Sequence, residues 1–435
     1  MATSGFATQR SFIILNRDLL LYAILIFLYG PVLPSAGASP LSSSGSFTSQ
    51  AFWLLVFANS MVLAALRKGN LPGLVLALGW LLPLTIWIMA SYYWSAFPDL
   101  TFRRAGREVI ELVSIVLLMS TYSDQTEPLR IVFLSFLTVF FADLASIPFP
   151  SFSYSELGFH GVHGSKNLLG ELYFLALPLF ALAIFDRRIA RWRLTAALAS
   201  FCAPGLLLFS HSKTAIGLVG VTTICLFAGW ALRWTAQYKG VFALLYFLIA
   251  TAIAIVVLAT GIEDTVTFLT GDPTLTGRTQ LWQYVLDRWE ESPYLGQGYG
   301  ALWQVGPEVE AYLRRAHVEG WVMNEAHNGY LDVLAQIGIV GICLLGFFMF
   351  SGLLILLFTR QTKLDEPNVW KWFAIYLTVG MLLYNITETT FFMGGDWLLF
   401  VAMCASALSS RGYSRANAGG EVRSAPQLGV ASIPN

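Results

Sequence analysis

Charged residues are scarce in this chain of 435 residues. Its 26 Lys and Arg and 26 Asp and Glu make up 12% of the sequence, whereas a soluble domain carries about 25%. This scarcity excludes an ordinary set of cytosolic domains and a disordered chain, and it leaves no basic surface for a nucleic acid. Cysteine is scarce as well. The four cysteines fall in apolar runs without CxxC spacing, so we expect packing residues and neither disulfides nor a metal site.

Long apolar runs are what the chain has instead, since hydrophobic residues make up 56% of it. A bilayer core needs about 20 apolar residues per helix. The sequence therefore predicts an all-α polytopic membrane protein with about twelve transmembrane helices. The predicted spans are approximately Ile13–Val32, Ala51–Leu66, Leu71–Tyr92, Val109–Tyr122, Ile131–Ile147, Leu168–Phe185, Leu194–Ser210, Ala215–Leu232, Val241–Thr260, Tyr330–Phe358, Phe373–Phe392 and Trp397–Leu408.

The first run has a second interpretation as a cleavable signal sequence. Arg10 and Arg17 precede its apolar part, and Ala36-Gly37-Ala38 resembles a cleavage site. Because eleven further spans make a separate secretion signal redundant, a retained helix is the favoured interpretation.

The distribution of Lys and Arg predicts the orientation in the membrane. With both termini in the cytoplasm, most of the basic residues lie on the cytoplasmic side, as the positive-inside rule requires. All five histidines then lie on the outer side, which favours acid–base chemistry there. The predicted organisation is spans one to nine in residues 1–260, a large outer loop in 261–329, spans ten to twelve in 330–408, and a disordered cytoplasmic tail in 409–435.

The large outer loop contains one clear amphipathic helix that begins at Arg278. Its apolar stripe has two tryptophans and suits a helix lying at the membrane interface; the stripe is Leu281, Trp282, Val285, Leu286 and Trp289. Arg278 at the helix start is a candidate anion-binding residue. The following Gly296-Gln297-Gly298-Tyr299-Gly300 lacks the flanking strand and helix of a phosphate loop, so we interpret it as a turn.

His327 is the strongest candidate for chemistry. It stands in Asn324-Glu325-Ala326-His327-Asn328-Gly329, directly before the tenth span, where the head group of a lipid-linked substrate would lie. Such a histidine can act as a general base on a hydroxyl group. The alternative is a histidine held at the interface for structural reasons.

Two outer turns each place a lysine at the start of a helix. They are Ser165-Lys166-Asn167 and Ser212-Lys213-Thr214. A lysine opposes the helix dipole at this end, so two of them indicate an anionic ligand. The alternative is that lipid phosphates or Glu171 neutralise these lysines.

Acidic residues in the predicted spans are further candidates. Asn385 and Glu388 lie near the outer end of the eleventh span, where an acid is costly. Glu388 either binds substrate or pairs with a lysine or with Arg278. Arg104 and Arg107 are spaced to form ion pairs with Glu108 and Glu111. Asp143 is alone in the fifth span, and the sequence assigns it no role.

These motifs resemble the O-antigen ligase and polysaccharide polymerase superfamily of bacterial inner-membrane proteins. The most specific part is Thr276-Gly277-Arg278 followed by His327-Asn328-Gly329-Tyr330-Leu331. Ser165-Lys166-Asn167 resembles the family's His-Lys-Asn turn with Ser165 in place of His. Ser212-Lys213-Thr214-Ala215 resembles its Ser-Arg-Thr-Ala turn with Lys213 in place of Arg. The overall layout is most similar to proteins that polymerise exopolysaccharide repeat units.

The resemblance implies a glycosyltransferase of the GT-C architecture, with one large periplasmic loop between spans nine and ten. It would use neither metal nor cofactor. Its partners would be an undecaprenyl-pyrophosphate-linked oligosaccharide, membrane lipids, and flippase and chain-length or export proteins. By the same analogy His327 and Arg278 are catalytic. The residues expected to bind the pyrophosphate or the glycan are Lys213, Lys166, Asn167, Arg104, Glu388 and Asn328.

Three other functions stay open at this point. An O-antigen ligase would use the same donor and loop but transfer the glycan to lipid A core. A flippase for lipid-linked oligosaccharides also has about twelve spans, although the sequence has no repeat between its halves and no paired broken helices at the midplane. A non-catalytic partner in a synthase complex is the third.

Overall fold

The structure is a computed structural model of the chain. It describes residues 2–31, 47–67, 71–124, 126–156, 158–234, 278–303, 325–359, 369–392 and 394–421. This part of the chain is almost entirely helical. The long helices are α1 (Ala2–Tyr29), α2 (Phe47–Leu66), α3 (Leu71–Ala90), α4 (Pro98–Ser120), α5 (Glu127–Ser146), α7 (Lys166–Ala183), α8 (Arg193–Phe209), α9 (Lys213–Trp234), α12 (Arg278–Glu290), α14 (Gly329–Phe358), α15 (Val369–Tyr384) and α16 (Gly395–Glu421).

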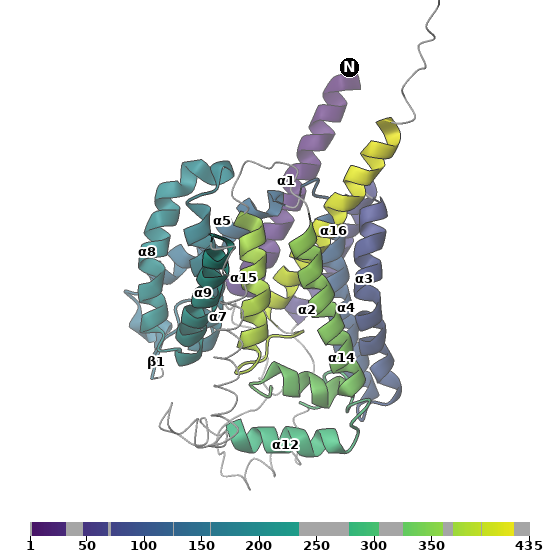
Figure 1. Cartoon of the computed structure of the whole chain (residues 1–435), viewed down its shortest axis with the longest axis vertical. Helices are drawn as coiled ribbons and strands as arrows, with labels where there is room; N and C mark the ends of the chain where they lie inside the picture. Colours follow the sequence, from purple (N-terminus) through teal and green to yellow (C-terminus); the bar gives the residue numbers. More distant parts are fainter. Residues whose placement is uncertain are drawn as a thin grey trace, which may run out of the picture.

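Short elements connect some of these helices. They are η1 (Ser91–Tyr93), α6 (Pro150–Ser153), η2 (Arg187–Trp192), and an antiparallel pair of two-residue strands, β1 (Tyr154–Ser155) and β2 (Gly158–Phe159). Most of the long helices run along the same axis, and α12 lies across the lower end of the bundle in Figure 1. In the same view α7, α8 and α9 lie on one side of α15, and α3, α4 and α16 lie on the other. We refer to the lower end as the α12 end.

Seven helical segments in the described part of the chain are long and apolar enough to cross a membrane. They are Phe12–Tyr29, Phe47–Leu66, Leu71–Tyr93, Glu127–Ser146, Lys166–Ala183, Arg187–Phe209 and Gly329–Phe358. They match the first, second, third, fifth, sixth, seventh and tenth predicted spans. The fourth, eighth, eleventh and twelfth lie on α4, α9, α15 and α16, while the ninth lies outside the described residues. The chain is thus a multi-pass membrane protein, and the number twelve stays a prediction.

Helix α4 lies inside the bundle, which explains its polar sequence. It packs against α2, α3 and α16. Because these neighbours separate it from lipid, α4 can carry buried carboxylates such as Glu108 and still pack Leu112, Val116 and Met119 in the core. By contrast, α2 and α3 expose large apolar side chains, among them Leu55, Val62, Val75 and Ile86, as helices facing lipid do.

Helix α14 is not one continuous span. Gly338 interrupts it with φ +70° and ψ −173°, so the helix has a short first part, Gly329–Ile337, and a long second part that begins at Ile339. Figure 1 shows the first part lying across the α12 end, nearly parallel to α12. The tenth predicted span thus contains a break that the sequence did not predict, and His327 precedes a short transverse helix.

Helix α12 has the predicted amphipathic pattern, but its apolar stripe packs on protein. Leu281 and Val285 are buried in a cluster with Ala335 of the first part of α14, and Leu331 packs against the same cluster. Protein thus covers Leu281 and Val285, and the location of α12 at the membrane interface stays a prediction. Periodicity showed the apolar face correctly, and the neighbouring helix covers it.

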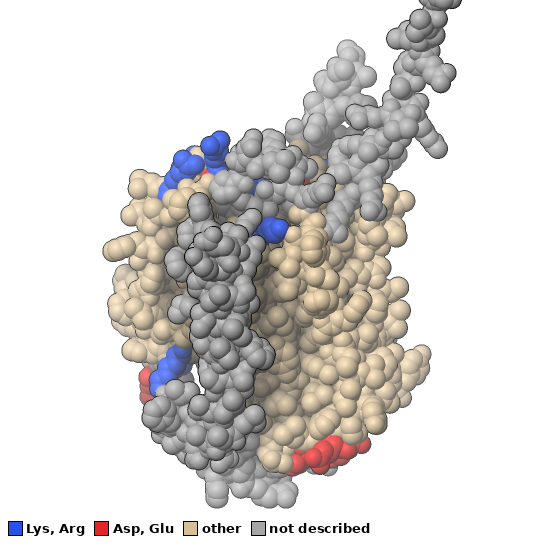
Figure 2. Space-filling model, viewed as in Figure 1, with Lys and Arg blue, Asp and Glu red and all other residues tan. Residues whose placement is uncertain are grey.

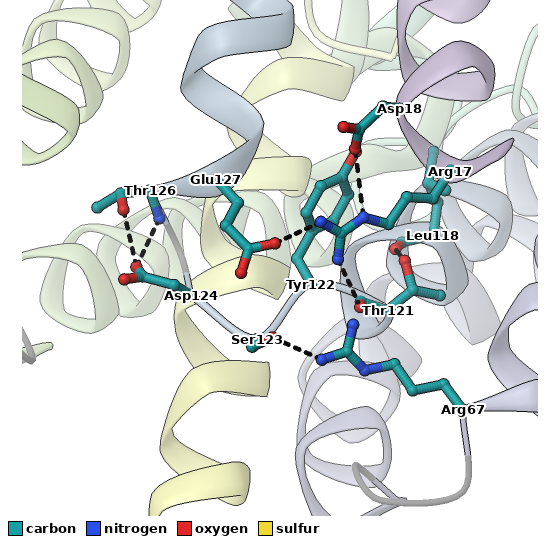
Figure 3. A network of polar contacts seen from close by, with 10 residues as sticks. All are labelled: Arg17, Asp18, Arg67, Leu118, Thr121, Tyr122, Ser123, Asp124, Thr126 and Glu127. Carbon is teal, nitrogen blue, oxygen red and sulfur yellow. Dashed lines mark hydrogen bonds and ion pairs between the residues drawn. The ribbon is translucent and has the colours of Figure 1, made fainter. Parts of the chain in front are cut away.

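Arg17 joins α1 to the turn between α4 and α5 (Figure 3). Its guanidinium donates to Glu127 Oε2 at 2.5 Å, to the Thr121 carbonyl at 3.1 Å and to Asp18 Oδ1 at 3.2 Å. The group also stacks over the Tyr122 ring at 4.1 Å. Since α1 packs along α5 as well, it has the contacts expected of a retained first span.

We expect Arg17→Ala to lower the free energy of unfolding by about 2 kcal/mol, because it leaves Glu127 and the Thr121 carbonyl without their charged donor. Thermal unfolding in detergent measures this change. Arg130→Gln, an exposed residue on α5, is the matched control and should leave the unfolding temperature unchanged. Equal unfolding temperatures for the two variants would contradict the role of Arg17.

Candidate active site

His327 lies at the α12 end with its ring between two carboxylates. Nδ1 is 2.9 Å from Oε2 of Glu388 and 3.5 Å from Oε1 of Glu325. A carboxylate at Nδ1 orients the imidazole and favours the tautomer with its proton on that nitrogen. Nε2 of that tautomer can accept a proton. The arrangement is that of a general base with an orienting acid.

The segment after His327 is tied to the end of α15. The Gly329 amide donates to the carbonyls of Asn385 at 2.8 Å and Glu388 at 3.0 Å. A Cβ on Gly329 would lie 1.9 Å from Oδ1 of Asn385, so only glycine permits this approach. These contacts hold Glu388 beside the imidazole.

Asn328 caps α14 and does not point away from the protein. Its Oδ1 accepts from the amides of Tyr330 and Leu331 at 3.1 Å each, and its Nδ2 donates to the Ile386 carbonyl at 3.1 Å. The side chain is thus engaged as an N-cap. A role in substrate binding stays a prediction.

Asp332 holds Ala326, the residue directly before His327, in place. Its Oδ1 accepts from the Trp303 indole at 2.5 Å and from the Ala326 amide at 3.2 Å, and Trp282 donates to the Ala326 carbonyl at 3.0 Å. The sequence motifs did not single out Asp332. A buried acid one turn into an apolar helix was the available signal.

Further carboxylates surround the His327–Glu388 pair. Asp396, Glu325 and Glu388 each lie within electrostatic range of Glu171 on α7. Potential ligand atoms of Glu325, His327 and Glu388 lie within 4.8 Å of one another. Two carboxylate oxygens and one imidazole nitrogen are a donor set that a divalent cation accepts, so the geometry by itself permits a metal here.

The two lysine turns meet at the same end of the bundle. Lys166 and Lys213 are the first residues of α7 and α9. A Cβ on Gly170 would lie 2.8 Å from Cβ of Ala215 and 2.9 Å from Oγ of Ser212, so the first turns of the two helices touch. Lys213 is exposed, and Lys166 is half-buried. These two adjacent helix N-termini, each with a lysine, are referred to as the lysine corner, and helix N-termini of this kind can bind an anion.

The lysine corner adjoins the His327 site through α7. Glu171, which follows Gly170, is in electrostatic range of Glu388 and Glu325. Asn167 is half-buried in the first turn of α7, beside Lys166. The structure therefore brings Lys166, Asn167, Lys213, Glu388 and His327 to one region, although residues 166–213 are far in sequence from residues 327–388.

Arg278 begins α12, and its side chain lies outside the described part of the structure. The backbone position of Arg278 can still be related to His327. Trp282, one helical turn later, binds the carbonyl of Ala326 directly before His327. The start of α12 is therefore close to the candidate base.

Arg104 makes a different contact from the predicted one. It donates to the Gly300 carbonyl, and Glu108 accepts from the Trp397 indole at 3.0 Å and from the Tyr299 hydroxyl at 3.3 Å. The expected Arg104–Glu108 ion pair was therefore wrong, because the 296–300 turn lies over this face of α4. Arg107 and Glu111 do form their expected pair at 3.3 Å. Burial raises the pKa of Tyr299, which keeps its hydroxyl protonated as a donor.

The 296–300 segment is a turn, as predicted, and it docks on the break in α14. The amides of Gln297 and Gly298 donate to the carbonyls of Ala335 and Gln336, both at 2.9 Å. The Ile339 amide donates to the Pro293 carbonyl at 2.9 Å. Carbonyls and amides that the break frees from the helix are satisfied in this way, and the transverse helix carrying Asp332 is held in place.

Comparison with known proteins shows what this chain is similar to. Residues 194–346 match a family model described as O-Antigen ligase. The chain is also 28% identical over 279 residues to the "Exopolysaccharide production protein ExoQ" of Rhizobium meliloti (strain 1021), a match covering 61% of this chain and 62% of that protein. The resemblance drawn from the sequence motifs is confirmed. Lys213, Arg278, His327 and Asn328 fall within residues 194–346.

We expect Gly338→Ala to destabilise the protein by about 1–3 kcal/mol, because alanine is strained at φ +70°. Its Cβ would also lie 2.2 Å from the Tyr294 carbonyl oxygen. Denaturant unfolding in detergent measures the loss. Gly346→Ala on the same helix is the control, since a Cβ there meets nothing within 4 Å. A Gly338→Ala variant as stable as Gly346→Ala would refute the docking.

Proposed function

We propose that the protein is a glycosyltransferase that polymerises undecaprenyl-pyrophosphate-linked repeat units into exopolysaccharide. The observation that carries this proposal is the His327–Glu388 pair beside a corner with two lysines at helix N-termini. A base next to an anion site is what transfer from a diphosphate donor to a hydroxyl needs. The similarity to an exopolysaccharide production protein supports the same substrate class.

The reaction follows from the placement of these groups. Nε2 of His327 accepts the proton of the acceptor hydroxyl while that oxygen attacks the anomeric carbon of the donor. The bond from the anomeric carbon to the pyrophosphate oxygen breaks, and its electrons leave with the diphosphate. Glu388 orients the imidazole and stabilises the imidazolium that forms.

Cationic groups stabilise the leaving diphosphate in this proposal. Lys166 and Lys213 supply point charges, and the amides of the first turns of α7 and α9 supply fixed dipoles. Arg278 would add a bidentate contact, which lysine cannot make. Because a diphosphate is already a competent leaving group, these charges and positioning suffice without a metal.

The α12 end faces the periplasm in this proposal, and both termini are cytoplasmic in the inner membrane. In Figure 2 the visible Lys and Arg side chains gather mainly at the upper end, and an acidic patch lies at the lower end. The positive-inside rule then assigns the upper end to the cytoplasm. A flippase would deliver the lipid-linked repeat to the periplasmic site, and chain-length or export proteins would take the product.

A second candidate is an O-antigen ligase, because the matching family model carries that description. It would use the same donor site and the same base, with a lipid A core sugar as acceptor. Deletion separates the two functions. Loss of a polymerase leaves single repeats on the lipid carrier, whereas loss of a ligase leaves full-length polymer on the carrier. Full-length polymer on the carrier after deletion would therefore contradict the polymerase function.

We expect His327→Ala to lower kcat for polymer formation by roughly 10²–10⁴-fold, because the acceptor hydroxyl loses its base. The assay uses purified protein with lipid-linked repeats and records polymer length. Asp287→Asn, on the exposed face of α12, is the control and should form polymer at the wild-type rate. Normal polymer from His327→Ala would refute the catalytic assignment.

We expect a chelator to leave the polymerisation rate unchanged, because the proposed chemistry has no step that needs a metal. The same assay with EDTA, followed by readdition of Mg²⁺ or Mn²⁺, measures this. Loss of activity with EDTA and its recovery with the metal would instead assign Glu325, His327 and Glu388 to a cation.

A further inference from the structure

Asp143 is a buried acid that the proposed reaction does not use. It lies on α5, one turn before the helix ends at the α12 end, and it is 0% exposed. Its Oδ1 accepts from the Val162 amide at 3.0 Å. Its Oδ2 accepts from the Tyr173 hydroxyl at 2.9 Å and lies 3.3 Å from Nε2 of His163. A buried carboxylate persists only with such partners.

The hydrogen bonds of Asp143 hold the connection between α5 and α7, residues 147–165, against the side of the bundle. Ser153 donates to the Ser146 carbonyl at 2.9 Å, and the amides of His160 and Gly161 donate to the Ser153 carbonyl. A Cβ on Gly161, whose φ is +59°, would lie 2.1 Å from Oδ1 of Asp143. The connection therefore folds back onto α5 and closes over Asp143.

The same connection leads directly to the lysine corner. His163 stands three residues before Lys166, and the intervening Ser165 caps α7 by accepting from the Leu168 amide at 3.3 Å. On its other side the connection touches the turn before α9, since a Cβ on Gly158 would lie 2.6 Å from the Ser210 carbonyl oxygen. Asp143 thus acts on the segment that contacts both lysine turns.

We propose that Asp143 and His163 are positioning residues for the pyrophosphate site: they fasten residues 158–165 to α5 and thereby set the position of Lys166 relative to Lys213. This proposal rests on the proposed function, in which the two lysines bind the diphosphate. The alternative is that the buried contacts contribute stability alone. The two differ in whether Asp143 acts through Lys166.

A double-mutant cycle in the polymerisation assay separates the positioning role of Asp143 from a purely stabilising role. Asp143→Asn keeps an acceptor for the Val162 amide but presents an amide to the donors of Tyr173 and His163. We expect the KM for the lipid-linked donor to rise about tenfold, the equivalent of one charged hydrogen bond, with kcat within about twofold of wild type. Inorganic pyrophosphate should inhibit this variant about tenfold more weakly.

The effect should vanish when Lys166 is already absent. Lys166→Gln alone should raise the donor KM, and adding Asp143→Asn should raise it no further, because coupled residues are not additive. A purely structural role predicts additive changes, which would overturn the proposal. His163→Gln should keep a near-normal donor KM, because its amide can donate from the place of Nε2. His163→Leu has no such donor and should raise the donor KM.

Glu127→Gln is the matched control, since Glu127 is a carboxylate with a charged partner at the opposite end of α5. It should lower the unfolding temperature without changing the donor KM. An Asp143→Asn variant with wild-type KM would overturn the positioning role alone. An unchanged KM for Lys166→Gln would instead contradict the lysine site, and polymer formation by His327→Ala would contradict the proposed base.

Discussion

His327 has a left-handed backbone conformation, with φ of 47°, which a residue with a side chain keeps only where its surroundings hold it. Two sets of contacts do so. Asn385 and Glu388 bind the Gly329 amide on one side, and Asp332 binds the Ala326 amide on the other. The imidazole therefore meets the Glu388 carboxylate in one orientation. The docked 296–300 turn, the break at Gly338 and the packing of α12 all support this segment.

Buried acidic side chains hold the segments at the α12 end together through hydrogen bonds. Asp143, Asp332 and Glu108 are each nearly inaccessible to solvent, and each accepts hydrogen bonds from side chains or amides of distant segments. A buried carboxylate is costly without such partners, so each one specifies which segments must meet. In the described part of the chain, several of the few charges thus lie buried near the α12 end, where they hold loops in place.

The sequence pointed to the candidate residues of the site but not to most of the residues that hold them in place. His327, Lys166 and Lys213 were recognisable because residue type and position at helix starts carry the signal. Asp332 was missed, and Asp143 had no assigned role, because their partners become neighbours only in the fold. The amphipathic pattern of α12 was right about its apolar face, but a pattern does not identify what covers that face. Gly338 was inconspicuous because a glycine within an apolar run is common in membrane helices.

The central claim is that the protein itself forms glycosidic bonds from a lipid diphosphate donor. The most direct measurement places the purified protein in lipid nanodiscs with the lipid-linked repeat as the sole substrate, and quantifies polymer and released undecaprenyl pyrophosphate. We expect one released diphosphate lipid for each new glycosidic bond. If the repeats stay intact on their carrier while proteoliposomes with the same protein move them across the bilayer, the protein is a transporter and the account is contradicted.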